Sequence, residues 1–163
     1  MGAHLNLILH YAGAKSGQRI SMPKPFIRGA KISLIGAIST TAVEAALYGE
    51  WATDANIFYH FIQHHLCPKL TKKHIVLLDN VAFHKDPRVE EAIKATGATI
   101  DFIPPYSPDY NPIEMLWSFV KNILRQMEVR TMKTFQSVLK FALGQITSEK
   151  LFGWYKHAGY RST

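Results

Sequence analysis

Residues 74–103, HIVLLDNVAFHKDPRVEEAIKATGATIDFI, carry the clearest pattern of secondary structure in the chain. It opens with an unbroken apolar run ending at Asp79, which favours a strand buried on both faces of a sheet covered by helices. Asp86 and Pro87 are typical of an N-cap and a first helical residue, and Gly97 is typical of a helix end. The last five residues, TIDFI, predict another strand. This strand, helix and strand indicate an α/β layer architecture.

Upstream residues predict a hairpin followed by a helix. Residues 31–41 (KISLIGAISTT) and 42–49 (AVEAALYG) contain β-branched residues and short apolar runs, which favour two paired strands. From residue 54 to residue 66 the apolar residues recur at helical spacing, which indicates an amphipathic helix. Its apolar face is formed by Phe58, Phe61, Ile62 and Leu66.

Downstream, a proline-rich loop, PPYSPDYNP, leads into a helix that begins at Pro112. Two more helices are predicted over residues 132–146 and 148–157. The helix that begins at Pro112 has an apolar stripe that consists of Leu116, Val120, Ile123, Leu124 and Met127. Together the elements predict a single domain over residues 1–163, with a mixed sheet flanked by helices.

The composition is that of a globular protein with excess positive charge. The 163 residues include 19 Lys and Arg against 12 Asp and Glu, which gives a net charge of +7 at pH 7. Such an excess is common in proteins that bind a polyanion, and many soluble proteins without that role share it. The single cysteine, Cys67, excludes an internal disulfide and fits a reducing compartment. No apolar run reaches the roughly 20 residues of a membrane span, so we expect a cytoplasmic protein and no membrane partner.

Asp79 is the first candidate for chemistry. An acid directly after a buried strand lies at the carboxyl edge of the sheet, where α/β folds commonly bind ligands. An Asp-Asn pair such as Asp79 and Asn80 also favours turns, so the carboxylate can instead start a turn or cap the following segment. Asp79 is therefore a candidate ligand with a structural alternative.

Glu114 is the second candidate. If Asn111 is the N-cap and Pro112 the first helical residue, Glu114 takes the third position and resembles the glutamate of a capping box. A carboxylate followed by cations on one helix face suits a metal site beside a phosphate backbone. The same face equally suits solvent exposure with helix salt bridges. The residues that share the face of Glu114 are Ser118, Lys121 and Arg125.

Taken together, the two acids predict a site for divalent cations. Two-metal phosphoryl transfer uses clustered carboxylates to hold two cations about 4 Å apart, one at the attacking oxygen and one at the leaving oxygen. Oxygen ligands favour Mg²⁺ or Mn²⁺ over zinc. Asp79 and Glu114 are the predicted catalytic and metal-binding residues.

The segments around these acids resemble a known family. LLDNVAFHK (residues 77–85) and FIPPYSPDYNPIEMLWSFVK (residues 102–121) are similar to the second and third blocks of bacterial insertion-sequence transposases of the mariner superfamily, which are DDE transposases. The 34 residues between Asp79 and Glu114 match the spacing that this superfamily favours. GQRI, KPFIRGAKISLIGAIS and GWYKHAGY resemble its flanks, so the resemblance covers nearly the whole chain.

The resemblance implies a ribonuclease H-like fold and metal-dependent cleavage and transfer of DNA strands. Asp79 matches the second catalytic acid of the family and Glu114 the third. Residues directly after the second acid match a block that would approach DNA, although turn and helix-entry structure explains them equally well. The residues expected near DNA are Asn80, His84, Lys85, Lys121 and Arg125. The implied partners are DNA and either a second copy of the chain or a full-length transposase.

The sequence departs from the family pattern at its beginning. The first catalytic acid of the family ends a strand, and matching backwards from GQRI places that position at or before Met1. The chain is therefore expected to lack its first strand and first aspartate, and to cleave DNA weakly or not at all. An exposed sheet edge would make it marginally stable or self-associating. The acids in the wrong elements to replace the first are Glu44, Glu50, Asp54, Asp101 and Asp109.

Two other functions stay open. A non-catalytic module would bind DNA through its basic surface, or would pair with full-length transposase and interfere with it. Its DNA binding would be salt-sensitive and would need no divalent metal. A ribonuclease H-like nuclease acting outside transposition is the third reading.

Overall fold

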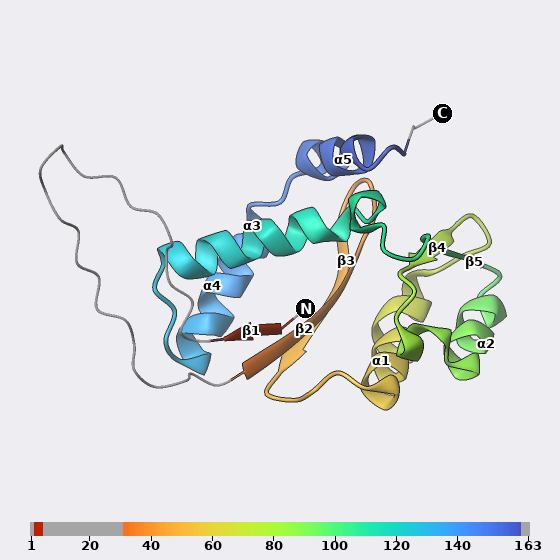
Figure 1. The fold of residues 1–163 in the computed structure, drawn as a ribbon, viewed down its shortest axis with the longest axis horizontal. Helices are drawn as coiled ribbons and strands as arrows, with labels where there is room; N and C mark the ends of the chain where they lie inside the picture. The colour runs from red at the N-terminus through yellow and green to blue at the C-terminus, as the bar shows by residue number, and fades with distance from the viewer. Residues whose placement is uncertain (1, 5–30, 161–163) are drawn as a thin grey trace, which may run out of the picture.

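The structure, a computed structural model, describes residues 2–4 and 31–160 (Figure 1). The GQRI block and the position matched to the first catalytic acid lie outside the described residues. In the described part, β1 (Gly2–His4), β2 (Lys31–Ile38) and β3 (Val43–Gly49) form an antiparallel sheet with β2 in the middle. The predicted hairpin is thus confirmed.

A second, parallel sheet contains β4 (Ile75–Leu78) and β5 (Thr99–Phe102), connected by α2 (Pro87–Ala95). Asp86 caps α2 by accepting a hydrogen bond from the backbone N–H of Arg88 at 2.9 Å. Gly97 follows the helix with a φ of +85°, a conformation that glycine adopts without steric cost. The strand, helix and strand predicted from the sequence are all present.

The expectation that β4 is buried on both faces is wrong in part. Val76 and Leu78 are buried with residues of α1 (Ala55–Phe61) and α2, whereas Ile75 is 66% exposed and Leu77 is half-buried. The described helices therefore cover one face of the strand more fully than the other. An apolar run reports total hydrophobicity and cannot reveal how completely each face is covered.

Helix α1 begins where the sequence predicts. The N-cap, Asp54, accepts a hydrogen bond from the N–H of Ile57 at 2.9 Å. The helix continues through a π-helical turn, η1 (Ile62–Leu66), and a 3₁₀ turn, η2 (Cys67–Lys69). All four residues of the predicted apolar face are buried: Phe58, Phe61, Ile62 and Leu66.

Three helices follow the second sheet: α3 (Ile113–Gln126), α4 (Met132–Gly144) and α5 (Ser148–His157). Figure 1 shows α3 running across the first sheet, with α5 beside it. Of the stripe predicted for α3, Met127 is wrong, because the helix ends at Gln126 and Met127 is 52% exposed. None of the helices in the described residues is long and apolar enough to cross a membrane.

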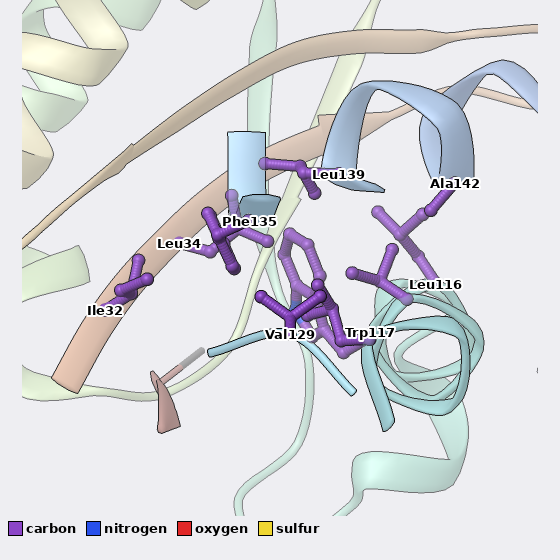
Figure 2. Packing of buried hydrophobic residues seen from close by; sticks show 10 residues of the cluster. Ile32, Leu34, Leu116, Trp117, Val129, Phe135, Leu139 and Ala142 are labelled. Atoms are coloured by element: carbon purple, nitrogen blue, oxygen red, sulfur yellow. The ribbon is translucent and has the colours of Figure 1, made fainter. Parts of the chain in front are cut away.

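The main core fills the space between β2, α3 and α4. Figure 2 shows side chains from the two helices gathered beside the strand. The closest approach is at Gly36 of β2, where an added Cβ would lie 2.6 Å from Cη2 of Trp117. Helix α3 is thus seated on a strand position that has no side chain. The buried residues of this cluster are Ile32, Leu34, Leu116, Trp117, Val120, Leu124, Val129, Phe135, Leu139 and Ala142.

Candidate functional site

Asp79 directly follows β4, at the carboxyl end of the parallel sheet. The neighbouring strand ends level with it, because the N–H of Ile103 donates to the carbonyl of Leu78 at 2.8 Å. The side chain of Asp79 is 40% exposed, so its carboxylate is reachable from solvent. This is the edge at which open α/β sheets bind ligands.

The carboxylate of Asp79 has a close partner in His84. The Nδ1 atom of His84 lies 2.5 Å from Oδ1 of Asp79 and 3.3 Å from the Asp79 carbonyl oxygen. The N–H of Val81 donates a longer hydrogen bond, 3.4 Å, to the same Oδ1. The hydrogen bond from His84 lowers the pKa of Asp79 below its ordinary value, an effect that partial burial opposes. Asp79 is therefore held in its charged form.

The turn that carries His84 is fixed against α1. His84 belongs to η3 (Ala82–Lys85), and its ring centroid lies 4.1 Å from that of Phe58 and 4.6 Å from that of Phe83. The side chain of His84 is 15% exposed. A ring packed in this way has few alternative rotamers. The tilted ring contact between Phe58 and His84 joins residues 26 positions apart, and no local sequence pattern predicts it.

Two neighbouring candidates have different surroundings. Asn80 donates from Nδ2 to the carbonyl of Ile103, which ties the end of β4 to the end of β5. Lys85 is exposed at the end of η3. The structure therefore gives Asn80 a structural partner and leaves the ammonium group of Lys85 in solvent.

Glu114 lies in the first turn of α3 and is exposed. The capping box that this segment resembles is absent, because the N-cap is Pro112 and the helix start has no side-chain cap hydrogen bond. Asn111 is instead the C-cap of the preceding 3₁₀ turn, η4 (Pro108–Tyr110), and its N–H donates to the carbonyl of Pro108 at 2.9 Å. The structural alternative for Glu114 therefore does not hold.

The face of α3 beyond Glu114 becomes progressively less exposed. Ser118 is exposed, whereas Lys121 and Arg125 are half-buried. The Nε atom of Arg125 is buried and has no hydrogen-bond partner in the described part of the chain. No salt bridge within the described residues joins Glu114 to Lys121 or Arg125. The alternative of a solvated face with helix salt bridges is therefore not what the structure shows.

The loop between β5 and α3 connects the two acids along the chain. Figure 1 shows it running from the edge where β4 and β5 end to the N-terminal end of α3. Tyr160, which follows α5, donates from its hydroxyl to the carbonyl of Tyr110 in this loop at 2.9 Å. Tyr155 of α5 donates similarly to the carbonyl of Ile38 at 2.8 Å. The paired residues are 50 and 117 positions apart in the sequence, so local sequence patterns do not predict either contact.

The donor atoms of Asp79 and Glu114 fit a hard divalent cation, because carboxylate oxygens are the ligands that Mg²⁺ and Mn²⁺ prefer. Among residues 2–4 and 31–160, no three His, Cys, Asp or Glu side chains are grouped to hold a metal ion. Two of the other acids have local partners: Asp54 caps α1, and Asp101 accepts from the N–H of Phe102 at 2.8 Å.

In this α/β protein Asp79 follows a strand at the carboxyl edge of a sheet, and Glu114 lies in the first turn of a later helix. Residues 1–136 match the sequence model of the DDE superfamily endonucleases, and the chain belongs to this family. No curated protein sequence is significantly similar to the chain.

Solved structures of the Mos1 mariner transposase have the same fold. The Mos1 paired-end complex with the left transposon end superposes with a TM-score of 0.77 at 16% identity, covering 96% of this chain and 49% of that one. The Mos1 mariner paired-end complex with Mn gives 0.78 at 17% identity, with the same coverage. The Mos1 strand transfer complex gives 0.78 at 16% identity, covering 98% and 50%. The predicted ribonuclease H-like α/β fold is confirmed, and the chain spans about half the length of these Mos1 chains.

Proposed function

We propose that this chain is the catalytic domain of a transposase of the bacterial insertion-sequence type, and that residues 1–163 form one domain. Its substrates would be the DNA of transposon ends and of the target. The Mos1 chains of the same fold are in complexes with a transposon end and with Mn. The chain would act with a second copy of itself or with a full-length transposase.

The observation that supports this function best is the setting of Asp79. Its charged, partly exposed carboxylate lies at the carboxyl edge of a parallel sheet, in a chain of the DDE superfamily endonucleases. Glu114, exposed and outside any capping box, is the proposed second ligand. The two carboxylates would hold Mg²⁺ or Mn²⁺, which would polarise the scissile phosphate and neutralise the charge that develops in the transition state.

The remaining side chains would position DNA. Lys85 is exposed, directly follows His84 in the chain, and would contact a phosphate. Lys121 and Arg125, both half-buried, would extend the same role along α3. Asn80 would act through the loop it ties down, because its amide is used within the protein.

Nicking of supercoiled plasmid in Mn²⁺ tests the proposal. Glu114→Gln removes the charge with little change in shape, and we expect it to abolish nicking. Glu149→Gln is the matched control, because Glu149 is also an exposed acid in the first turn of a helix, α5, and has no proposed role. Nicking that survives Glu114→Gln would refute the assignment.

The positive charge supports a second candidate, a non-catalytic module that binds DNA or interferes with full-length transposase. A net charge of +7 attracts DNA without any metal. Filter binding at several salt concentrations, with and without Mn²⁺, separates the two. Salt-sensitive binding without nicking at any Mn²⁺ concentration would favour the module.

A further inference from the structure

His84 has a geometry that neither the family match nor the proposed function assigns to it. We propose that His84 is a positioning residue, which holds the carboxylate of Asp79 through Oδ1 so that Oδ2 is presented to a divalent cation. The inference rests on the proposed function, because Asp79 must be a metal ligand for the orientation to matter.

The two carboxylate oxygens of Asp79 have different contacts. Oδ1 faces Nδ1 of His84 at 2.5 Å and the N–H of Val81 at 3.4 Å. No hydrogen bond within the described residues engages Oδ2. A ring N–H at Nδ1 of His84 would donate to this carboxylate. The arrangement thus fixes the carboxylate through Oδ1 and leaves Oδ2 without a partner among the residues that the structure describes.

The orientation is fixed because the ring of His84 is itself fixed. Phe58 from α1 packs on it at 4.1 Å, and Phe83 packs edge-on at 4.6 Å. Phe58 is 5% exposed and belongs to the buried cluster beneath β4 and α2. A chain of contacts therefore runs from the core through His84 to Asp79. Partners of this kind around metal ligands typically change affinity by about 10–100-fold when removed.

The same geometry argues against a direct role for His84 in holding DNA. Its side chain is 15% exposed, and Nδ1 is occupied by Asp79. Lys85, the next residue, is exposed. The turn thus carries two adjacent side chains with separate tasks, one directed at the carboxylate and one at solvent.

Two carboxamide substitutions isolate the hydrogen bond. In His84→Asn the side-chain amide nitrogen reaches the place of Nδ1, whereas in His84→Gln it reaches the place of Nε2. Both lose the ring that packs on Phe58, so they share the packing cost and differ in where the donor lies. We expect His84→Gln to weaken Mn²⁺ binding by about 10–100-fold, and His84→Asn to stay close to the wild type. Mn²⁺ affinity is measured by the electron paramagnetic resonance signal of the free ion.

A measurement on the metal-free protein gives an independent readout. Long-range ¹⁵N–¹H spectra of the histidine rings identify which nitrogen of His84 carries the proton. We expect the Nδ1–H tautomer, with a shift that moves in Asp79→Asn. A bare Nδ1 would overturn the proposal without reference to metal or activity.

The patterns of outcome separate this inference from the proposed function. Equal Mn²⁺ affinity of the two His84 variants, with affinity lost in Asp79→Asn, overturns the positioning role and leaves the metal site standing. Mn²⁺ binding unchanged by Asp79→Asn and Glu114→Gln overturns the metal site and the positioning role together. A weak His84→Gln beside a wild-type-like His84→Asn supports both.

Discussion

Gly36→Ala tests the seating of α3 on the sheet, which places Glu114. An added Cβ at residue 36 would meet Cη2 of Trp117 at 2.6 Å, Cζ2 at 3.3 Å and the carbonyl oxygen of Ala45 at 3.4 Å. The Trp117 ring is 6% exposed and packed within the main core, so it has little room to move away. The helix or the strand must therefore shift.

The expected loss of stability follows from two opposing terms. Overpacking a well-filled core costs about 1–3 kcal/mol. Replacing a glycine within a strand recovers about 0.5–1 kcal/mol, because alanine loses less backbone entropy on folding. We therefore expect Gly36→Ala to lower the free energy of unfolding by about 1 kcal/mol, the middle of a net range of about 0–2.5 kcal/mol.

The assay is urea unfolding followed by far-ultraviolet circular dichroism. Gly153→Ala in α5 is the matched control, because an added Cβ there has no atom within 4 Å. We expect this control to raise the free energy of unfolding by about 0.5–1 kcal/mol. Trp117→Phe in the Gly36→Ala background should recover part of the loss, since phenylalanine lacks the clashing ring atoms.

The clash with Trp117 in the Gly36→Ala variant should also affect metal binding. Trp117 lies one turn after Glu114 on α3, so a displaced helix moves the proposed metal ligand. Gly36→Ala should weaken Mn²⁺ binding, whereas Gly153→Ala should not. A Gly36→Ala variant at least as stable as the wild type would show that the approach of α3 to β2 is looser than the structure indicates.

Three further predictions concern single contacts. Tyr155→Phe should lower the free energy of unfolding by about 1 kcal/mol at pH 7, because the hydrogen bond to Ile38 is lost. Burial raises the pKa of Tyr155 to about 12, so the wild type should lose stability as the pH rises from 10 toward 12, and Tyr155→Phe should flatten that slope in alkaline urea titrations. The pKa of Asp79 is lowered mainly by the hydrogen bond from His84, so the stability that this contact contributes is present above the ordinary value of 3.8 and is lost as the pH falls through the folded-state pKa. The difference in stability between wild type and His84→Gln should therefore shrink in acid to the cost of the lost ring packing on Phe58; a difference that is the same at pH 7 and pH 2 would contradict this. Lys85→Ala should reduce the slope of log DNA affinity against log salt by about 1, and an unchanged slope would remove Lys85 from the DNA interface.

Local sequence patterns predict most of the elements of the fold. Asp86 and Gly97 mark the ends of α2 in both sequence and structure, because caps and positive-φ positions select residue types directly. Asp79 and Glu114 can also be identified as candidates from the sequence, because one follows an apolar strand pattern and the other begins an amphipathic helix pattern. A capping box at Asn111 does not form because its backbone N–H already donates to Pro108 at the end of the preceding 3₁₀ turn. An N-cap sequence motif does not reveal this competing hydrogen bond.

The surroundings of the candidate site depend on contacts between distant segments. Phe58 meets His84, Tyr160 meets Tyr110, and Trp117 lies over Gly36 across 81 positions of sequence. The spacing of apolar residues along the sequence does not predict these pairs, because each pair depends on how one packed element lies against another. The sequence identifies Asp79 as an acid at a strand end through local chemistry, whereas the partner of its Oδ1 follows from the packing of η3 against α1. Secondary-structure preferences depend on residues a few positions apart in the chain. Side-chain packing depends on residues that are distant in sequence and become neighbours only in the folded protein.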